Sequence, residues 1–201
     1  MKGLPLNTDM ARAWHEGRKS VTRRRVKLRA HPHGREWHAP WHRGGGVWCF
    51  TAGWGLSIMG LDVMSPYQPG EVVYIQEPWG VEKGRYIQPS SPYGGKFEDE
   101  IFYRADDPNL PGMKWRSPIT MPEWASRSKA RIVDVRPERV REITHEEAIA
   151  EGAAFMPEAE PRYEALSVPQ IVFAGYWDSL HPGSWDRDDW VWRYGLERVD
   201  E

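Results

Sequence analysis

The chain has 201 residues, a single cysteine and a formal net charge of −2. This length fits one domain with insertions and a sizeable hydrophobic core. The lone Cys49 excludes an intramolecular disulfide, and no stretch approaches the roughly 20 apolar residues of a membrane helix. We therefore expect a soluble, cytoplasmic protein with no signal peptide and no membrane partner.

The first predicted element is a short helix near the N-terminus. Thr8 or Asp9 suits its N-cap, and Gly17 suits the residue just beyond its end. A turn leading to Val26 should follow. Lys19 and Thr22 lie in that turn, three residues apart, and residues at this spacing share one face of a helical turn.

The same short segment combines a candidate nucleophile with candidate anion ligands. A hydroxyl such as that of Thr22 attacks well only when a neighbouring base, here the Lys19 amine, removes its proton. Three arginines follow at once, and guanidinium groups suit phosphate. From Arg12 to Arg43 ten Lys and Arg residues stand against two acidic residues, which favours an anionic ligand or a solvated basic face near this third of the chain.

The next stretch, residues 29–70, reads as irregular, and a loop of that length usually has a function. It holds four histidines and the cysteine, which are zinc-ligand types, but their spacing matches no closed zinc motif. We therefore predict no metal and no other cofactor. The residues concerned are His31, His33, His38, His42 and Cys49.

The remaining elements predict an α+β fold. Strands are expected at 71–77, 101–104, 128–137 and 190–199, with a hairpin or loop over 80–100. Thr144 and Glu147 form a predicted capping box for a helix over 145–151, and further helices are expected within 162–180. An acidic turn, 186–189, should precede the last strand. Several short strands with few helices suggest a small mixed β-barrel with peripheral helices, and most tryptophans should lie in its core.

The Lys19 and Thr22 pair needs a third group to orient it or balance its charge. A carboxylate is the natural candidate. Glu77, at the end of one predicted strand, and Glu151, near the end of the Thr144 helix, both qualify. Their positions in the sequence do not choose between them.

Several motifs together resemble the ASCH domain family, whose small β-barrels are related to the PUA fold. Residues 17–24 (GRKSVTRR) are similar to the G-x-K-x-x-x-x-R signature of that family. Residues 67–79 (YQPGEVVYIQEPW) resemble a strand of phage and prophage members. Further similarity lies in 121–127, 143–152, 177–180 and 190–192. The resemblance implies one ASCH-like domain over 1–201, with insertions at about 29–66 and 80–100.

The resemblance also implies a function and a set of site residues. Some bacterial members hydrolyse the amide of N4-acetylcytidine with a lysine, a threonine and a glutamate. Lys19 and Thr22 match the first two positions, and Glu151 matches the third in preference to Glu77. By the same resemblance we expect substrate binding by four residues: Arg23, Arg24, Glu77 and Trp79.

The leading hypothesis is thus an amidohydrolase that removes an acyl group from N4-acylated cytidine or a similar modified nucleoside. Lys19 would act as general base, Thr22 as nucleophile, and Glu151 would position Lys19 or protonate the leaving amine. Two alternatives remain. One is a non-catalytic module that binds RNA or nucleotides, with tryptophans stacking on bases, and the other is a ribonuclease.

Overall fold

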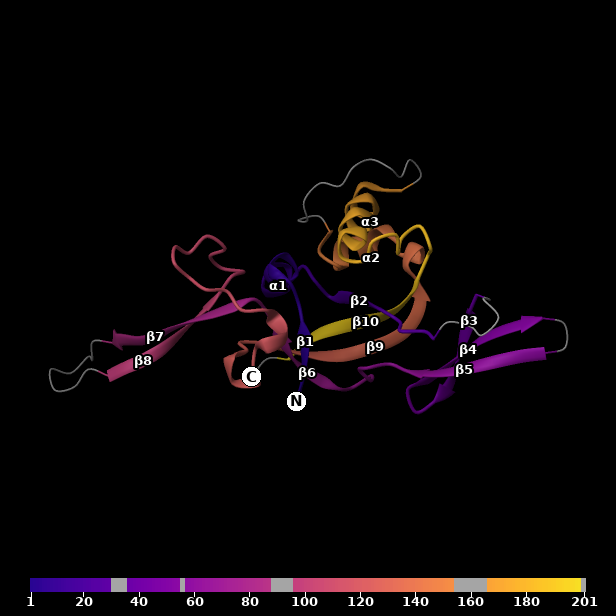
Figure 1. The fold of residues 1–201 in the computed structure, drawn as a ribbon, viewed down its shortest axis with the longest axis horizontal. Helices are drawn as coiled ribbons and strands as arrows, with labels where there is room; N and C mark the ends of the chain where they lie inside the picture. The colour runs from indigo at the N-terminus through magenta and orange to yellow at the C-terminus, as the bar shows by residue number, and fades with distance from the viewer. Residues whose placement is uncertain (30–35, 55–56, 88–95, 154–165, 200–201) are drawn as a thin grey trace.

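The computed structural model describes residues 1–29, 36–54, 57–87, 96–153 and 166–199. These residues form the predicted mixture of strands and a few helices, so the α+β class is confirmed (Figure 1). The strands are β1 Lys2–Pro5, β2 Val21–Arg25, β3 His38–Gly44, β4 Val47–Trp54, β5 Ser57–Met64, β6 Val72–Gln76, β7 Trp79–Ile87, β8 Lys96–Tyr103, β9 Lys129–Arg139 and β10 Trp190–Val199. The α-helices are α1 Thr8–His15, α2 His145–Ala150 and α3 Val168–Leu180, and three short 3-10 helices are η1 Pro118–Thr120, η2 Glu123–Ala125 and η3 Val140–Glu142.

A five-stranded sheet forms the centre, in the order β1-β6-β9-β10-β2. The β1–β6 pair is parallel and the other pairs are antiparallel. The two edge strands approach each other, because the Arg24 guanidinium on β2 donates a hydrogen bond to the Pro5 carbonyl on β1. Among the described strands no backbone ladder joins these edges, so the sheet is open and a closed barrel is not found.

Two smaller sheets extend from opposite ends of the central sheet (Figure 1). One contains β3, β4 and β5, and the other is the β7–β8 hairpin. The expectation of an irregular stretch is therefore wrong over 38–64. Its glycine run is a hairpin turn, since Gly44, Gly45 and Gly46 all adopt positive φ between β3 and β4. The hairpin expected within 80–100 is confirmed, although residues 88–95 lie outside the described part.

The predicted helices lie close to where the sequence placed them. The prediction of Thr8 or Asp9 as the N-cap of α1 is wrong, because Asn7 caps this helix and accepts a hydrogen bond from the Met10 N–H at 2.9 Å. Thr144 caps α2 by accepting a hydrogen bond from the Glu147 N–H at 3.2 Å. The predicted capping box is only half realised, because the Glu147 carboxylate instead binds Arg23, Arg136 and Arg193. Residues 186–189 form the expected turn before β10. The helix predicted at 162–166 lies mostly outside the described residues.

Helices α2 and α3 cover one face of the central sheet (Figure 1). Most tryptophans of the described part join the core, as predicted, although Trp41 and Trp124 are exposed. No helix within the described ranges is both long and apolar enough to cross a membrane. The largest fully buried side chains include Trp14, Trp192, Tyr194, Phe50 and Phe173.

Two glycines allow a matched test of how tightly α1 and α2 pack. Gly17 (φ 75°) and Gly152 (φ 94°) both follow a helix in the left-handed region. A Cβ on Gly152 would lie 3.0 Å from the Cβ of Ala13, whereas a Cβ on Gly17 would meet no atom within 4 Å. Gly17→Ala should lower the free energy of unfolding by about 1–2 kcal/mol, and Gly152→Ala should lower it further. Urea denaturation compares them, and equal losses would contradict this packing.

Candidate active site around Lys19 and Glu151

Glu16 and Gly17 form a turn after α1, and residues 18–20 have no regular secondary structure. Strand β2 begins at Val21, so the predicted turn is wrong at Thr22.

The segment between α1 and β2 is held from both sides by backbone hydrogen bonds. The Ser20 N–H donates to the Ala150 carbonyl at 2.9 Å, and the Ser20 carbonyl accepts from the Leu196 N–H at 2.8 Å. Lys19 is therefore fixed between the end of α2 and strand β10, while Thr22 lies within β2.

Lys19 and Glu151 form a direct, fully enclosed ion pair. The Lys19 amine donates to the Glu151 carboxylate at 2.7 Å, to the Glu151 carbonyl at 3.0 Å and to the Val21 carbonyl at 2.7 Å. These bonds use all three donors of an ammonium group. Burial lowers the pKa of Lys19, and the attraction of Glu151 opposes that shift. The structure thus brings together the lysine and the glutamate named by the resemblance.

Arg23 links this pair to two more carboxylates. Its Nε donates to Glu138 at 2.7 Å, one terminal nitrogen lies 3.3 Å from Glu151, and the other contacts Glu147. Although burial is the largest single effect and acts to lower it, the pKa of Arg23 is raised by these three glutamates together. The Arg23 side chain is fully enclosed, so it holds carboxylates and faces no solvent.

Thr22 is also enclosed, and it lies opposite Tyr194 in the β2–β10 pair. Successive side chains of a strand point to opposite faces, so Thr22 and Arg23 point apart. The Thr22 hydroxyl is buried without a hydrogen-bond partner, and it does not bond to Lys19. Such orphaned buried groups are uncommon and call for an explanation.

The other predicted substrate-binding residues lie apart from this cluster. Arg24 is half-buried and shares a strand face with Thr22. The enclosed Glu77 carboxylate instead contacts His15 at 2.8 Å and Arg127 at 2.9 Å. Trp79 is buried in a small separate cluster. Of the two candidate carboxylates, Glu151 is the one that contacts Lys19.

The sequence interpretation missed the two glutamates that neutralise Arg23. Burial raises the pKa of Glu138, against the attraction of Arg23. Burial acts the same way on Glu147, but Arg23, Arg193 and Arg136 lower its pKa overall. The sequence carried no local signal for these pairs, because Glu138 and Glu147 stand 115 and 124 residues from Arg23.

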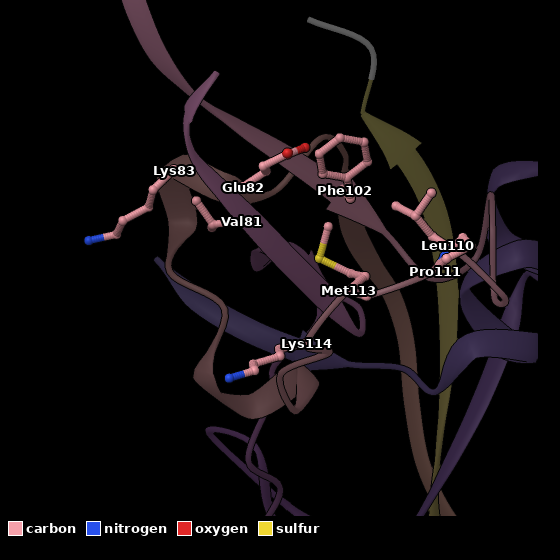
Figure 2. Close-up of a pocket in the computed structure, with 9 residues that line it drawn as sticks. Val81, Glu82, Lys83, Phe102, Leu110, Pro111, Met113 and Lys114 are labelled. Carbon is pink, nitrogen blue, oxygen red and sulfur yellow. The ribbon is translucent and has the colours of Figure 1, made fainter. Parts of the chain in front are cut away.

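A cleft of about 730 Å³ lies at the β7–β8 hairpin. Phe102, Leu110 and Met113 line it, and Lys83 and Lys114 extend their amines away from them (Figure 2). None of the predicted catalytic residues contributes to its wall.

The predicted histidines do not gather around one point in the described part. His38 and His42 are exposed on β3, whereas His31 and His33 lie outside the described residues. Among the described residues, no three His, Cys, Asp or Glu side chains are grouped as metal ligands.

Comparison of the chain with protein-family models, curated proteins and solved structures finds no match.

The ion network predicts a large difference between two arginines that bind the same carboxylates. Arg23→Met removes the fully enclosed cation that contacts Glu138, Glu147 and Glu151 together, which should cost about 3–5 kcal/mol of stability at neutral pH. Arg136→Met removes contacts to Glu138 and Glu147 from a partly exposed side chain and should cost at most about 1 kcal/mol.

Urea unfolding at two pH values measures both losses. Burial already raises the pKa of Glu138 against the attraction of Arg23. In Arg23→Met this carboxyl takes up a proton more readily when folded than when unfolded, so the stability deficit of the variant should narrow as the pH falls toward the ordinary value of about 4.5. Equal losses for the two variants at neutral pH would contradict the network.

Proposed function

We propose that this protein is an amidohydrolase of the ASCH type that removes the acyl group from N4-acylated cytidine or a similar modified nucleoside. The observation that carries the proposal is the contact between the Lys19 amine and the Glu151 carboxylate at 2.7 Å. It unites residues 132 positions apart, and Thr22, whose hydroxyl is buried and unpartnered, is the third member of the set.

In the proposed reaction Lys19 removes the proton of the Thr22 hydroxyl as Thr22 attacks the acyl carbon. The amine here bonds the Val21 carbonyl, and Thr22 points to the face of β2 opposite Arg23. The step therefore requires β2 to move until the Thr22 hydroxyl takes the place of that carbonyl at the amine. The C–N bond then breaks, the exocyclic amine leaves with a proton, and an ester remains on Thr22. Water hydrolyses that ester and releases the acid.

Burial supports this role for Lys19, because a general base must be unprotonated and burial lowers the pKa of the amine. Glu151 holds the amine in position, and Arg23 holds Glu151. Thr22 and Lys19 are both enclosed, so the proposal includes an opening step before the substrate binds.

The barrel-like ASCH fold is part of the same proposal. The contact of Arg24 with Pro5 supports it, since this bond draws the two edge strands of the sheet together. A PUA-like barrel would require further pairing between these edges.

Two alternatives to amide hydrolysis remain predictions: a module that only binds RNA or nucleotides, and a ribonuclease. In the first, Lys19 and Glu151 serve stability alone. In the second, Lys19→Ala or Arg24→Ala would abolish RNA cleavage.

Release of acetate from N4-acetylcytidine tests the proposed reaction directly. Thr22→Val keeps the size of the side chain and removes the nucleophile, so turnover should fall about 10²–10⁴-fold or more. Thr22→Ser keeps a hydroxyl and should retain part of the activity. Wild-type rates for Thr22→Val or for Lys19→Ala would refute the mechanism, and no acetate release by the wild-type protein would favour a binding module.

The pH dependence of that turnover reports on Lys19. The active form carries a neutral amine, so kcat/KM should rise with pH through the Lys19 pKa. Because burial lowers this pKa from 10.5, the rise should be centred below that pH. Glu151→Gln removes the attraction that favours the ammonium form, so the rise should move to still lower pH. A rise centred at or above 10.5 in the wild-type protein would contradict the assignment.

A further inference from the structure

A second cleft lies where β2 ends, and none of the proposed catalytic residues lines it. Its volume is about 710 Å³, within the range of small-molecule sites. Four arginines and two acidic residues line it, which leaves a net charge of two positive. The arginines are Arg25, Arg29, Arg139 and Arg187, and the acidic residues are Glu36 and Asp189.

The outer part of the cleft holds a pair of guanidinium groups on one carboxylate. Asp189 lies 3.2 Å from Arg25 and 3.0 Å from Arg187. The Arg25 and Arg187 side chains are 45% and 54% exposed, so an arriving anion meets donors at the surface. A phosphate suits such a pair, because it offers several acceptor oxygens to two planar forks.

The inner part of the cleft is aromatic and rigidly built. The Trp190 indole N–H donates to the Trp37 carbonyl at 2.9 Å, and Phe50 packs edge-on against the Trp190 ring. The Arg139 guanidinium lies over that ring, 4.3 Å from its centre. A guanidinium plane and tryptophan rings are surfaces on which nucleic-acid bases stack.

Hydrogen bonds hold Arg139 in this orientation. It donates to Glu36 at 2.6 Å and to the carbonyl of Asp188 at 2.9 Å. Asp188 adopts φ of 52°, a left-handed conformation that few residues other than glycine use. The turn before β10 thus aims a backbone acceptor at the arginine, which fixes the aromatic end relative to the charged end.

We propose that this cleft binds a nucleoside phosphate, with the phosphate on Arg25 and Arg187 and the base against the Arg139 guanidinium, which lies over the Trp190 ring. The ligand is either a free nucleotide or one nucleotide of a strand, because both present the same chemistry. This binding does not depend on amide hydrolysis at Thr22, and it stands or falls separately from the proposed reaction.

Adenosine 5′-monophosphate is a suitable probe, since it carries no acyl group and cannot be a substrate of the proposed hydrolase. Calorimetric titration of the full chain should show tighter binding of this nucleotide than of adenosine or inorganic phosphate. Losing the charge-assisted bonds in the double variant Arg25→Gln/Arg187→Gln should weaken nucleotide binding about tenfold or more. Binding of adenosine should be unchanged.

Two further variants test the charges in and outside the cleft, the first as a control. Arg43→Gln removes an exposed arginine of β3 that pairs with Asp62 and lies outside the cleft, so nucleotide binding should not change. Asp189→Asn removes the carboxylate that competes with phosphate and should tighten binding. Equal affinity for phosphate and nucleotide, no nucleotide binding, or wild-type affinity in the double variant would overturn the proposal.

A short oligoadenylate separates the two sources of the ligand. If it binds more tightly than the mononucleotide, and the double variant loses that gain, the cleft takes one nucleotide of a strand. If the two bind equally, the cleft takes a free nucleotide. Either result supports the nucleoside-phosphate site.

Discussion

The interaction on which the rest of this structure depends is the enclosed contact of Lys19 and Arg23 with Glu151. It ties three distant parts of the chain together: the start of β2, the end of α2 and, through Glu138, strand β9. Buried charges are costly unless each is paired and hydrogen-bonded. The packing of α2 on the sheet therefore has to preserve this set of bonds as a unit.

This network divides β2 into two chemically different faces. On the helix-covered face Arg23 is neutralised by carboxylates and makes no contact with solvent. On the other face Thr22 lies opposite Tyr194, whose hydroxyl pairs with Ser65 at 2.9 Å. Burial raises the pKa of Tyr194, so this face is uncharged around Thr22 apart from Arg24. The basic residues of the N-terminal third therefore have two different roles. Arg23 neutralises buried glutamates, and Arg25 contributes to an exposed charged surface.

The sequence predicted the ends of helices where nearby residues alone determine them. Thr144 caps α2 and Gly17 ends α1 because caps are set by adjacent backbone. The expectation that residues 29–70 are irregular was wrong at the β3–β5 sheet, because the pairing of these strands gives no clear local signal. Pairing of Lys19 with Glu151 followed from a resemblance and not from spacing, because contacts between distant segments depend on sheet order. Glu138 was missed for the same reason.

The position of β2 also explains how an enclosed site and an open cleft can belong to one strand. Among the described strands, β2 pairs in the sheet with β10 alone, and Arg24 links it to β1 by a side chain rather than a ladder. Opening along that edge requires the Arg24–Pro5 hydrogen bond to break, and the proposed reaction also requires the Thr22 hydroxyl to reach the Lys19 amine. Thr22 and Arg25 are three residues apart, about 10 Å in a strand. A ligand seated at the cleft therefore lies next to the edge that must open to expose the Thr22 hydroxyl.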